Sequence, residues 1–350
     1  MKQKNKNKIA LIFGVTGQDG AYLSKFLLKK KYTVHGVKRR ASQPNTYRVD
    51  DIYKDPLVKK SNFFLHYGDV TDSISVFSII NKIRPNEIYN LAAQSHVAVS
   101  FDMPEYTTNA DASGTLRILE SINRIDKKIK FYQAGSSEMF GKVVETPQNE
   151  KTPFYPRSPY GVAKVYSHWI TINYRESYNI FASNGILFNH ESPLRGETFV
   201  TKKVVKALCN IKLKKQKKLF LGNLSAKRDW GHAEDYVEAM WKILQYKKPD
   251  DFVICTGKQY SIRDFVNMVA KVLNMKLFWR GKGINEKAFD ENKNCIIECS
   301  KKYFRPAEVD TLKGNASKAK KLLKWKPRHN IQSLIKDMIS YELEIHKNDK

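Results

Sequence analysis

The stretch KIALIFGVTGQDGAYLSKFLLKK, residues 8–30, decides the fold. It begins with a short apolar run, continues through Gly14, Gly17 and Gly20, and ends in a helix-like segment. Glycines between a strand and a helix let the backbone approach a pyrophosphate, whose charge the helix N-terminus stabilises. The stretch therefore predicts a strand, a phosphate-binding loop and a helix, which together begin a dinucleotide-binding fold.

The alternation of short apolar runs with helix-like segments continues through the first half of the chain. This pattern is typical of a parallel sheet covered by helices. The expected strands are residues 8–13, 33–38, 62–65, 87–91, 130–134 and 181–187, and the expected helices are 21–30, 73–83, 109–121 and 161–177. After Leu187 the pattern loosens, with helix-like stretches at 199–211, 234–244 and 262–273. We expect an α/β protein with a Rossmann-like, doubly wound parallel sheet and a smaller mixed α/β region that binds the substrate.

The same pattern suggests how the chain divides. We expect residues 1–187 to form the Rossmann domain, to which a later segment at roughly 230–260 returns. Residues 188–229 and 261–345 would form the smaller region, and the tail 346–350 is expected to be disordered. We find no internal repeat and no long low-complexity linker that would separate independent domains.

The composition excludes several classes of protein. A chain of 350 residues with 41% hydrophobic residues can bury a substantial core. No apolar run approaches the roughly 20 residues that span a bilayer, and residues 1–8 are polar and basic. Cys209, Cys255, Cys295 and Cys299 lack the paired spacing and neighbouring histidines of a metal site. We expect a cytoplasmic protein with reduced thiols, no metal and no membrane partner.

The formal net charge is +27, from 62 Lys and Arg against 35 Asp and Glu, and it raises nucleic acid as a partner. However, basic residues cluster only in residues 1–8 and 212–218, and elsewhere they are scattered and mostly lysine, as on solvated faces. We therefore expect no nucleic-acid partner. The charge does suit an anionic small substrate such as a nucleotide diphosphate.

The glycine spacing is G-x-x-G-x-x-G, one residue longer in its first gap than the G-x-G-x-x-G fingerprint, and it indicates a loop of the short-chain dehydrogenase type. Where an NAD enzyme places an acidic residue after the second strand, this chain has Arg39 and Arg40. Two guanidinium groups match a ribose 2′-phosphate, so we expect NADP, although a basic surface also explains them. The loops after the first, third and fourth strands supply the other expected cofactor contacts: Gly14, Thr16, Gly17, Gln18, Asp19, Gly20, Asp69, Val70, Leu91, Ala93 and Ser95.

The expected catalytic residues are Ser136, Glu138, Tyr160 and Lys164. Tyr160 and Lys164 are four residues apart, which puts them on one helix face. A nearby ammonium favours a phenolate, so we expect Lys164 to lower the pKa of Tyr160 and to bond the nicotinamide ribose. Ser136 would hydrogen-bond the substrate hydroxyl that Tyr160 deprotonates. Glu138 adds a general acid/base that an epimerase does not need, although a helix N-terminal charge is the simpler alternative.

Long stretches of the chain resemble the GDP-mannose 4,6-dehydratases. They are residues 14–20 (GVTGQDG), Arg39-Arg40, 65–69 (LHYGD), 90–97 (NLAAQSHV), 136–141 (SSEMFG), 153–164 (PFYPRSPYGVAK), 185–201 (GILFNHESPLRGETFVT), 222–232 (GNLSAKRDWGH) and 303–310 (YFRPAEVD). The resemblance implies conversion of GDP-mannose to GDP-4-keto-6-deoxymannose with bound NADP. In that reaction Tyr160 takes the C4 hydroxyl proton during hydride transfer, Glu138 removes the C5 proton, water leaves C6, and the hydride returns to C6.

The resemblance also implies contacts that the motifs alone do not reveal. Tyr106, His190 and Arg195 match cofactor contacts of the family, as Lys164 does. The implied contacts to the GDP-sugar are Ser95, Ser136, Glu138, Tyr160, Asn189, Lys203, Arg228, Arg305 and Glu308. Residues 39–48 (RRASQPNTYR) fall in a loop that contributes to subunit contacts in the family, which implies a homodimer or homotetramer.

Other functions remain open from the sequence. The nearest is the same 4,6-dehydration on GDP-D-glycero-manno-heptose, whose extra carbon alters only the C6 end. A catalytically silent dinucleotide-binding sensor would explain the glycine loop, and a nucleic-acid-binding protein would explain the charge. Neither explains why Ser136, Glu138, Tyr160 and Lys164 occur together.

Overall fold

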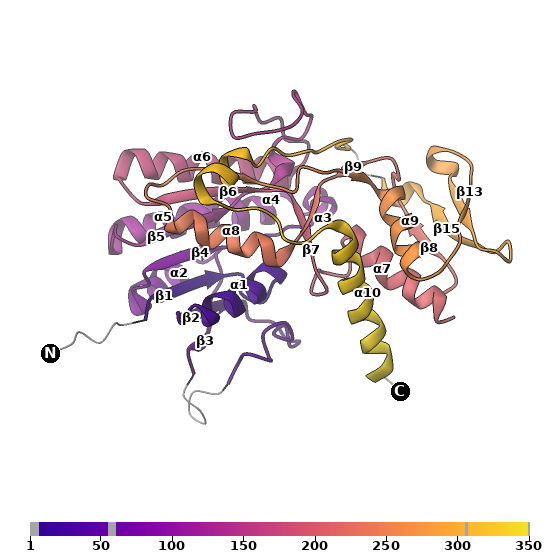
Figure 1. The fold of residues 1–350 in the computed structure, drawn as a ribbon. Coiled ribbons are helices and arrows are strands. Elements are labelled where there is room, and N and C mark those ends of the chain that lie inside the picture. Colours follow the sequence, from indigo (N-terminus) through magenta and orange to yellow (C-terminus); the bar gives the residue numbers. More distant parts are fainter. Residues whose placement is uncertain (1–6, 55–60, 305–306, 349–350) are drawn as a thin grey trace.

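The computed structural model describes residues 7–54, 61–304 and 307–348. A sheet of seven parallel strands, in the order β11-β6-β5-β4-β1-β2-β3, runs through the larger part of the molecule (Figure 1). Its strands are β1 Ile9–Phe13, β2 Thr33–Lys38, β3 Phe63–Tyr67, β4 Glu87–Asn90, β5 Lys130–Ala134, β6 Ala182–Leu187 and β11 Phe252–Ile254. The sequence predicts each of them except β11.

Helices cover both faces of this sheet, as the doubly wound prediction requires. One face packs against α1 (Gln18–Lys29) and α8 (Ala233–Gln245). The other packs against α2 (Ser73–Ile83), α5 (Gly114–Ile125) and α6 (Pro159–Tyr178). Within β1, Ala10 and Ile12 pack on the first face, and Leu11 and Phe13 pack on the second. A strand buried on both faces is apolar at every position, which is why β1 reads as a continuous apolar run.

The order of the strands reverses beside β1. This strand pairs with β2 on one side and with β4 on the other, and all three are parallel. In open α/β sheets ligands bind beyond the carboxyl ends of the strands at such a switch point. The glycine loop after β1 and the loop after β4 therefore meet at the same crevice.

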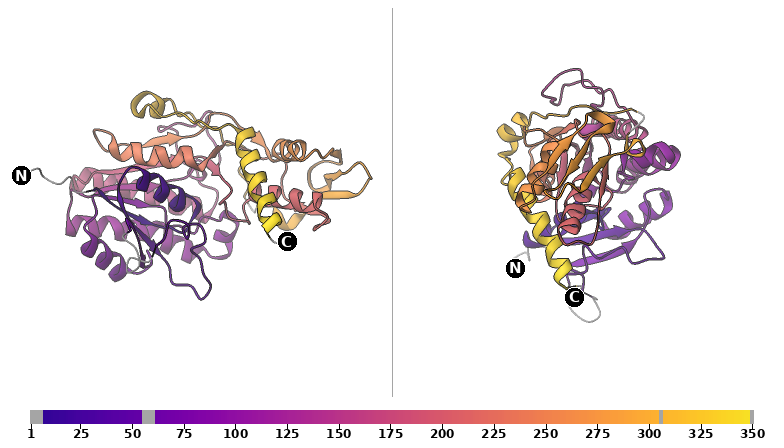
Figure 2. Two further views of the ribbon diagram at one scale, coloured as in Figure 1. Left: turned by 60° about the horizontal axis from the view of Figure 1, so that its bottom comes forward. Right: turned by 90° about the vertical axis from the view of Figure 1, so that its right-hand side faces the viewer.

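The smaller region lies at one side of the large sheet, and the left view of Figure 2 shows it as a separate group of elements. Its four-stranded mixed sheet has the order β13-β14-β15-β8. The elements are β8 Leu219–Leu221, β13 Phe278–Arg280, β14 Lys287–Phe289, β15 Cys295–Cys299, and the helices α7 Val200–Lys212, α9 Ile262–Val272 and α10 Ile331–Asn348. Two short strand pairs connect the regions: β7 Asn189–Glu191 with β10 Trp230–His232, and β9 Lys227–Arg228 with β12 Tyr260–Ser261.

The structure corrects two predictions about helices. The segment predicted as one helix at 109–121 is a π-helical turn, η1 (Thr108–Ser113), followed by α5. Helix α10 extends through Asn348, so the prediction of a disordered tail is wrong for 346–348, while 349–350 lie outside the described residues. Short helices that the sequence does not predict are α3 Val97–Asp102, α4 Pro104–Thr107, η2 Ser137–Met139, η3 Gly283–Asn285, η4 Lys301–Tyr303 and η5 Ala319–Leu323. Among the described helices, none is both long and apolar enough to cross a bilayer.

Candidate functional site

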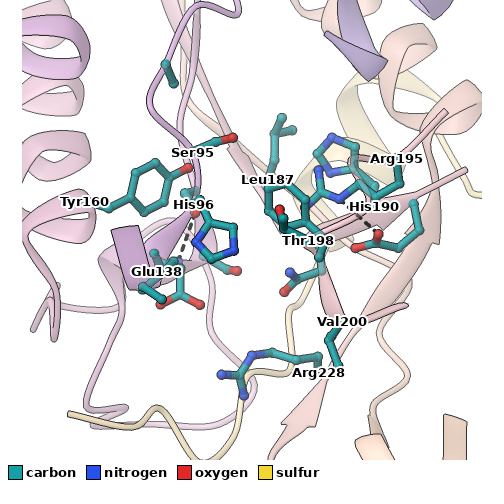
Figure 3. A pocket seen from close by; sticks show the side chains of 18 of the residues that line it. Ser95, His96, Glu138, Tyr160, Leu187, His190, Arg195, Thr198, Val200 and Arg228 are labelled. Carbon is teal, nitrogen blue, oxygen red and sulfur yellow. Dashed lines mark hydrogen bonds and ion pairs between the residues drawn. The ribbon is translucent and has the colours of Figure 1, made fainter. Parts of the chain in front are cut away.

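A cavity of about 540 Å³ opens beyond the carboxyl ends of the large sheet, and residues of the smaller region close its far side (Figure 3). Most of the predicted site residues line it: Gly14, Gly17, Gln18, Asp19, Gly20, Leu91, Ala93, Ser95, Ser136, Glu138, Tyr160, Lys164, Asn189, His190, Arg195, Lys203, Arg228 and Glu308. The structure thus brings together residues that lie almost 300 positions apart in the sequence.

The glycine loop is shaped for close approach of a ligand to the backbone. Gly14 has a φ of +81°, and a Cβ there would lie 2.8 Å from the amide nitrogen of Ala92. A Cβ on Gly20 would lie 2.5 Å from the carbonyl oxygen of Gly14. The loop ends at the N-terminus of α1. The N-cap residue there is Gly17, which has no side chain to cap the first turn. These features fit a dinucleotide pyrophosphate.

An ion pair joins this loop to the segment after β6. His190 Nδ1 lies 2.8 Å from the Phe188 carbonyl oxygen, and its Nε2 lies 2.7 Å from Asp19 Oδ2. Both neighbours are acceptors, so both ring nitrogens donate and the imidazole is charged. Burial opposes this charge, but Asp19 and the Phe188 carbonyl outweigh burial and raise the pKa of His190. His190 therefore holds the first turn of α1, in the place where the sequence predicts a cofactor contact.

The predicted catalytic residues come from the ends of β5 and from α6. Ser136 is the N-cap of η2, and its Oγ accepts from the backbone N–H of Glu138 at 3.2 Å. Ser158 caps α6 in the same way, through the N–H of Gly161 at 3.0 Å. The two caps fix the turns that carry Glu138 and Tyr160, and Figure 3 shows both side chains facing the cavity.

The structure contradicts the expectation that Lys164 lowers the pKa of Tyr160. Burial, and next the carboxylate of Asp111, raise the pKa of Tyr160 above its ordinary value, while the bond with Ser136 opposes this. Lys164 is itself buried, and its Nζ donates to the carbonyl oxygen of Ala134 at 3.0 Å and lies 5.8 Å from the centre of the Tyr160 ring. Burial lowers the pKa of Lys164, and Asp111 opposes that shift. Desolvation outweighs the attraction that the sequence suggested.

The remaining predicted cofactor residues do not line this cavity: they are Thr16, Arg39, Arg40, Asp69, Val70 and Tyr106. Arg39 follows β2, and its NH1 donates to the hydroxyl of Tyr106 in α4 at 2.6 Å. Asp69 follows β3, and its Oδ1 accepts from the backbone N–H of Thr71 at 2.9 Å. Arg39 and Asp69 thus follow the carboxyl ends of β2 and β3, the two strands on one side of β1, toward which a dinucleotide would extend from the glycine loop.

The residues predicted for the GDP-sugar come mainly from the smaller region. Arg228 NH1 donates to the carbonyl oxygen of Val309 at 2.7 Å, and its NH2 lies 3.4 Å from Glu308 Oε1. The Nζ of Lys203 lies 3.5 Å from the centre of the Tyr303 ring, at the same wall. Arg305 lies outside the described residues. A guanidinium and an ammonium beside an aromatic ring suit a diphosphate and a base.

Sequence reasoning missed several residues of the site. His96 lines the cavity, and its Nδ1 accepts from the N–H of Val99 at 3.3 Å, so it caps α3. The stretch NLAAQSHV contains it, but its role as a cap depends on a short helix that the sequence does not predict. Thr198 and Phe304 also line the cavity. Asp111 is buried behind Tyr160 and Lys164, and its sequence context reads as an ordinary helix surface.

A second group of titratable side chains lies at the start of α8. His232, Glu234 and His329 offer ligand atoms within 4.8 Å of one another. The two imidazole rings stack with centres 4.3 Å apart, so their lone pairs do not converge on one point. His232 Nδ1 accepts from the N–H of Glu234, which leaves the proton on Nε2 to donate to Asp337 at 3.0 Å. This geometry serves as a helix cap and a link to α10 rather than as a metal centre.

A dinucleotide loop after β1, with Ser136 after β5 and Tyr160 and Lys164 in α6, is the arrangement typical of the short-chain dehydrogenase class, and Glu138 lines the same cavity. The chain belongs to the GDP-mannose 4,6-dehydratase family, because the family model described as GDP-mannose 4,6 dehydratase matches residues 11–338. This confirms the family resemblance that the motifs indicate.

Individual relatives agree with this assignment. The chain is 55% identical over 350 residues to a GDP-mannose 4,6-dehydratase of Vibrio cholerae serotype O1, covering 96% of this chain and 94% of that protein. It is 54% identical over 349 residues to a GDP-mannose 4,6 dehydratase of Drosophila melanogaster, covering 99% of this chain and 88% of that protein. A solved structure of dTDP-glucose 4,6-dehydratase from Bacillus anthracis, in complex with NAD, is similar with a TM-score of 0.80 at 19% sequence identity. The match covers 97% of this chain and 98% of that chain. The last comparison supports the fold.

Proposed function

We propose that this protein is an NADP-dependent GDP-mannose 4,6-dehydratase, a hydro-lyase that converts GDP-mannose into GDP-4-keto-6-deoxymannose and water. One observation carries the proposal: Glu138 lies in the same cavity as Ser136, Tyr160 and Lys164. A Ser, Tyr and Lys set oxidises and reduces a sugar carbon, and loss of water needs the additional acid/base.

The residues present fit NADP. The glycine loop and the N-terminus of α1 would hold the pyrophosphate, Arg39 and Arg40 the 2′-phosphate, and Lys164 the nicotinamide ribose. When bound, NADP supplies the chemistry that accepts a hydride from C4 and returns it to C6. Asp69 would accept from the adenine amino group.

Tyr160 acts first, as the base that takes the proton of the C4 hydroxyl. Ser136 bonds the same hydroxyl and orients it. Because burial raises the pKa of Tyr160, the phenolate needs stabilisation, which the Ser136 hydroxyl and the Arg195 guanidinium would supply, since both lower this pKa. The C4 carbon becomes a ketone, which acidifies the proton on C5.

Glu138 carries out the elimination. Its carboxylate takes the C5 proton and passes it to the C6 hydroxyl, so that the C6–O bond breaks and water leaves. When C6 has been reduced, the proton that Tyr160 holds returns to C5. The phenolate and the Glu138 carboxylate are then restored, and the cycle neither takes up nor releases a net proton.

The substrate would span both regions of the molecule. Lys203, Arg228 and Glu308 would bind the GDP part, and Ser95 and Asn189 would contact the sugar. Arg305 is proposed for the diphosphate from its sequence position alone. The same catalytic set would serve a GDP-linked manno-heptose, so the residues around C6 decide between the two sugars.

The direct test is turnover of purified protein with NADP and either GDP-mannose or GDP-D-glycero-manno-heptose. We expect 4-keto-6-deoxy product from GDP-mannose with the higher kcat/KM. A higher kcat/KM on the heptose would reverse the choice of substrate, and no product from either would refute the proposed function.

Glu138→Gln tests the mechanism. We expect a loss of turnover of at least 100-fold, the lower end of what a general acid/base contributes, with NADPH binding by fluorescence nearly unchanged. Glu176→Gln, an exposed position on α6, is the matched control and should retain activity. Retained turnover in Glu138→Gln would remove this residue from the mechanism.

We also propose a cytoplasmic homodimer. Val162, Tyr166 and Trp169 form a stripe on one face of α6, and they are 57%, 42% and 57% exposed. Spacings of four and three residues place them on the side of α6 that is not packed on the sheet. A second copy meeting the same face through a twofold axis would cover this stripe. We retain the domain division at residue 187, with β11 and α8 returning to the larger domain.

A further inference from the structure

One buried acidic residue near the catalytic set has no role in the mechanism above. Asp111 lies in η1 and is 1% exposed. Its Oδ1 accepts from the backbone N–H of Gln94 at 2.7 Å. Its Oδ2 is buried and has no hydrogen-bond partner within the described part of the chain. A carboxylate in this state is strongly destabilised unless a positive charge compensates it.

The backbone of η1 places Asp111 directly behind α6. Its carbonyl oxygen accepts from the hydroxyl of Ser167 at 2.8 Å and from that of Thr115 in α5 at 2.9 Å. Ser167 follows Lys164 by three residues, so the two side chains lie on the same face of α6. The wider π-helical turn is a form that recurs at functional sites. It holds Asp111 where a regular helix would present a different side chain.

Lys164 is the compensating charge. It is 3% exposed, and its Nζ donates to the Ala134 carbonyl, a neutral group. Each of the two buried charges acts on the other through space: Lys164 lowers the pKa of Asp111, and Asp111 raises that of Lys164. Burial is the larger effect and leaves the pKa of Asp111 at about 6.

The other groups around this pair are accounted for. From α6, Tyr160 is buried, and burial raises its pKa, which the carboxylate of Asp111 raises further. From α5, the guanidinium of Arg117 bonds Asn109 and the Val70 carbonyl oxygen, so it is directed to the other side of η1. Glu138 and Arg195 act on Tyr160 from the cavity side, with opposite signs.

We propose that Asp111 is a positioning residue of the dehydratase: its carboxylate is the buried counter-charge that keeps Lys164 protonated, and it sets the pH range in which Tyr160 exchanges its proton. Its effect on catalysis rests on the proposed function, whereas the charge pairing does not. Asp111 touches neither substrate nor cofactor in this assignment, and it acts through Lys164 and Tyr160.

Asp111→Asn tests the catalytic part, because the amide oxygen can still accept from Gln94 while the charge is lost. Removal of the negative charge should lower the pKa of both Tyr160 and Lys164. We therefore expect both limbs of the pH profile of kcat to move to lower pH by about one pH unit. This is the size of shift that a neighbouring charge produces in a pKa. A purely structural role would lower kcat without moving the limbs, and that result would overturn the proposal. Asp126→Asn, the same charge change outside the site, should leave the profile in place.

A double-mutant cycle tests the pairing without activity, using urea unfolding of wild type, Asp111→Asn, Lys164→Gln and the double variant. At pH 8 we expect the double variant to be more stable than the sum of the two single changes predicts. The difference should shrink near pH 4.5, where Asp111 is protonated. If Asp111→Asn does not fold, recovery of folding by adding Lys164→Gln gives the same answer. Additive changes at both pH values would overturn the proposal, whereas an inactive wild type with intact coupling would refute only the proposed function.

Discussion

At the scale of single residues, two buried carboxyl groups give the fold a pH dependence of unusual sign. Burial raises the pKa of both Asp111 and Asp229 to about 6, from an ordinary value of 3.8. The folded state therefore binds these protons more tightly than the unfolded state does. Their contribution to stability is fully present below pH 4 and is lost as the pH rises through about 6, by roughly 3 kcal/mol for each group.

The raised pKa of Asp111 predicts a measurable contribution to the slope of the free energy of unfolding against pH. Urea unfolding from pH 4.5 to 7.5 should show a free energy of unfolding that falls less, or rises more, with pH in Asp111→Asn than in wild type. Burial lowers the pKa of His35, His66 and His168, so these histidines act in the opposite direction within this range. They are present in both proteins, so the difference between the two pH curves reports Asp111. Parallel slopes for wild type and variant would show that Asp111 is already ionised throughout this range.

The same residues show how much of the site the sequence could predict. Glu138, Tyr160 and Lys164 stand in motifs, and the structure places all three at one cavity. The motifs do not predict the raised pKa of Tyr160, because this pKa depends on desolvation and on Asp111. Asp111 lies 49 positions upstream and has no motif of its own. Burial of a charge is a property of packing, and no local pattern in the sequence records it.

At the scale of elements, α6 carries two of the proposed catalytic residues, Tyr160 and Lys164, and Tyr160 lies in its first turn. Ser158 is the N-cap and Pro159 occupies the first turn, so the start of the helix is fixed two residues before Tyr160. Ser158→Ala should reduce the free energy of unfolding by about 1 kcal/mol, as loss of an N-cap does. We expect kcat to fall as well, because the turn that holds Tyr160 loses its anchor.

Ser158→Thr provides the matched control, since threonine also caps helices. Stability by urea unfolding and kcat should both return toward wild type in this variant. If Ser158→Ala loses stability while kcat stays at the wild-type value, the cap supports the fold but does not position Tyr160.

Elements with clear periodicity were predicted well, and irregular ones were not. Strand β2 and helix α2 have the predicted bounds, because their apolar patterns end at polar or turn residues. The π-helical turn η1 was predicted as regular helix, since a widened turn leaves no distinct pattern in the sequence. Strand β11 has only three residues, and its place beside β6 comes from the packing of the whole sheet rather than from its own sequence.

At the scale of the whole molecule, hydrogen bonds link the larger region to the smaller one beside the glycine loop. The buried ion pair between Lys202 in α7 and Glu342 in α10 lies within the smaller region, and Lys202 also donates to the Pro193 carbonyl at 2.8 Å. Arg48, from the loop after β2, donates to the carbonyl oxygens of Leu194 and Thr16. These contacts tie the glycine loop to the segment that carries Arg195, so cofactor and substrate would bind to one connected frame.

The proposed dimer belongs to the same scale, and the apolar stripe on α6 makes it testable. Trp169→Glu places a charge at a position where two copies of the stripe would meet, and burial of an unpaired charge opposes association. Light scattering should give the mass of one chain for this variant and of two chains for wild type, with unchanged circular dichroism. Phe220→Glu alters an aromatic that is 42% exposed on β8, away from the stripe, and should leave the mass unchanged. A wild-type mass in Trp169→Glu, or dissociation caused by Phe220→Glu instead, would move the interface to another face. Because Tyr160 lies on the same helix as the stripe, dissociation should also lower kcat if the partner helix supports the catalytic turn.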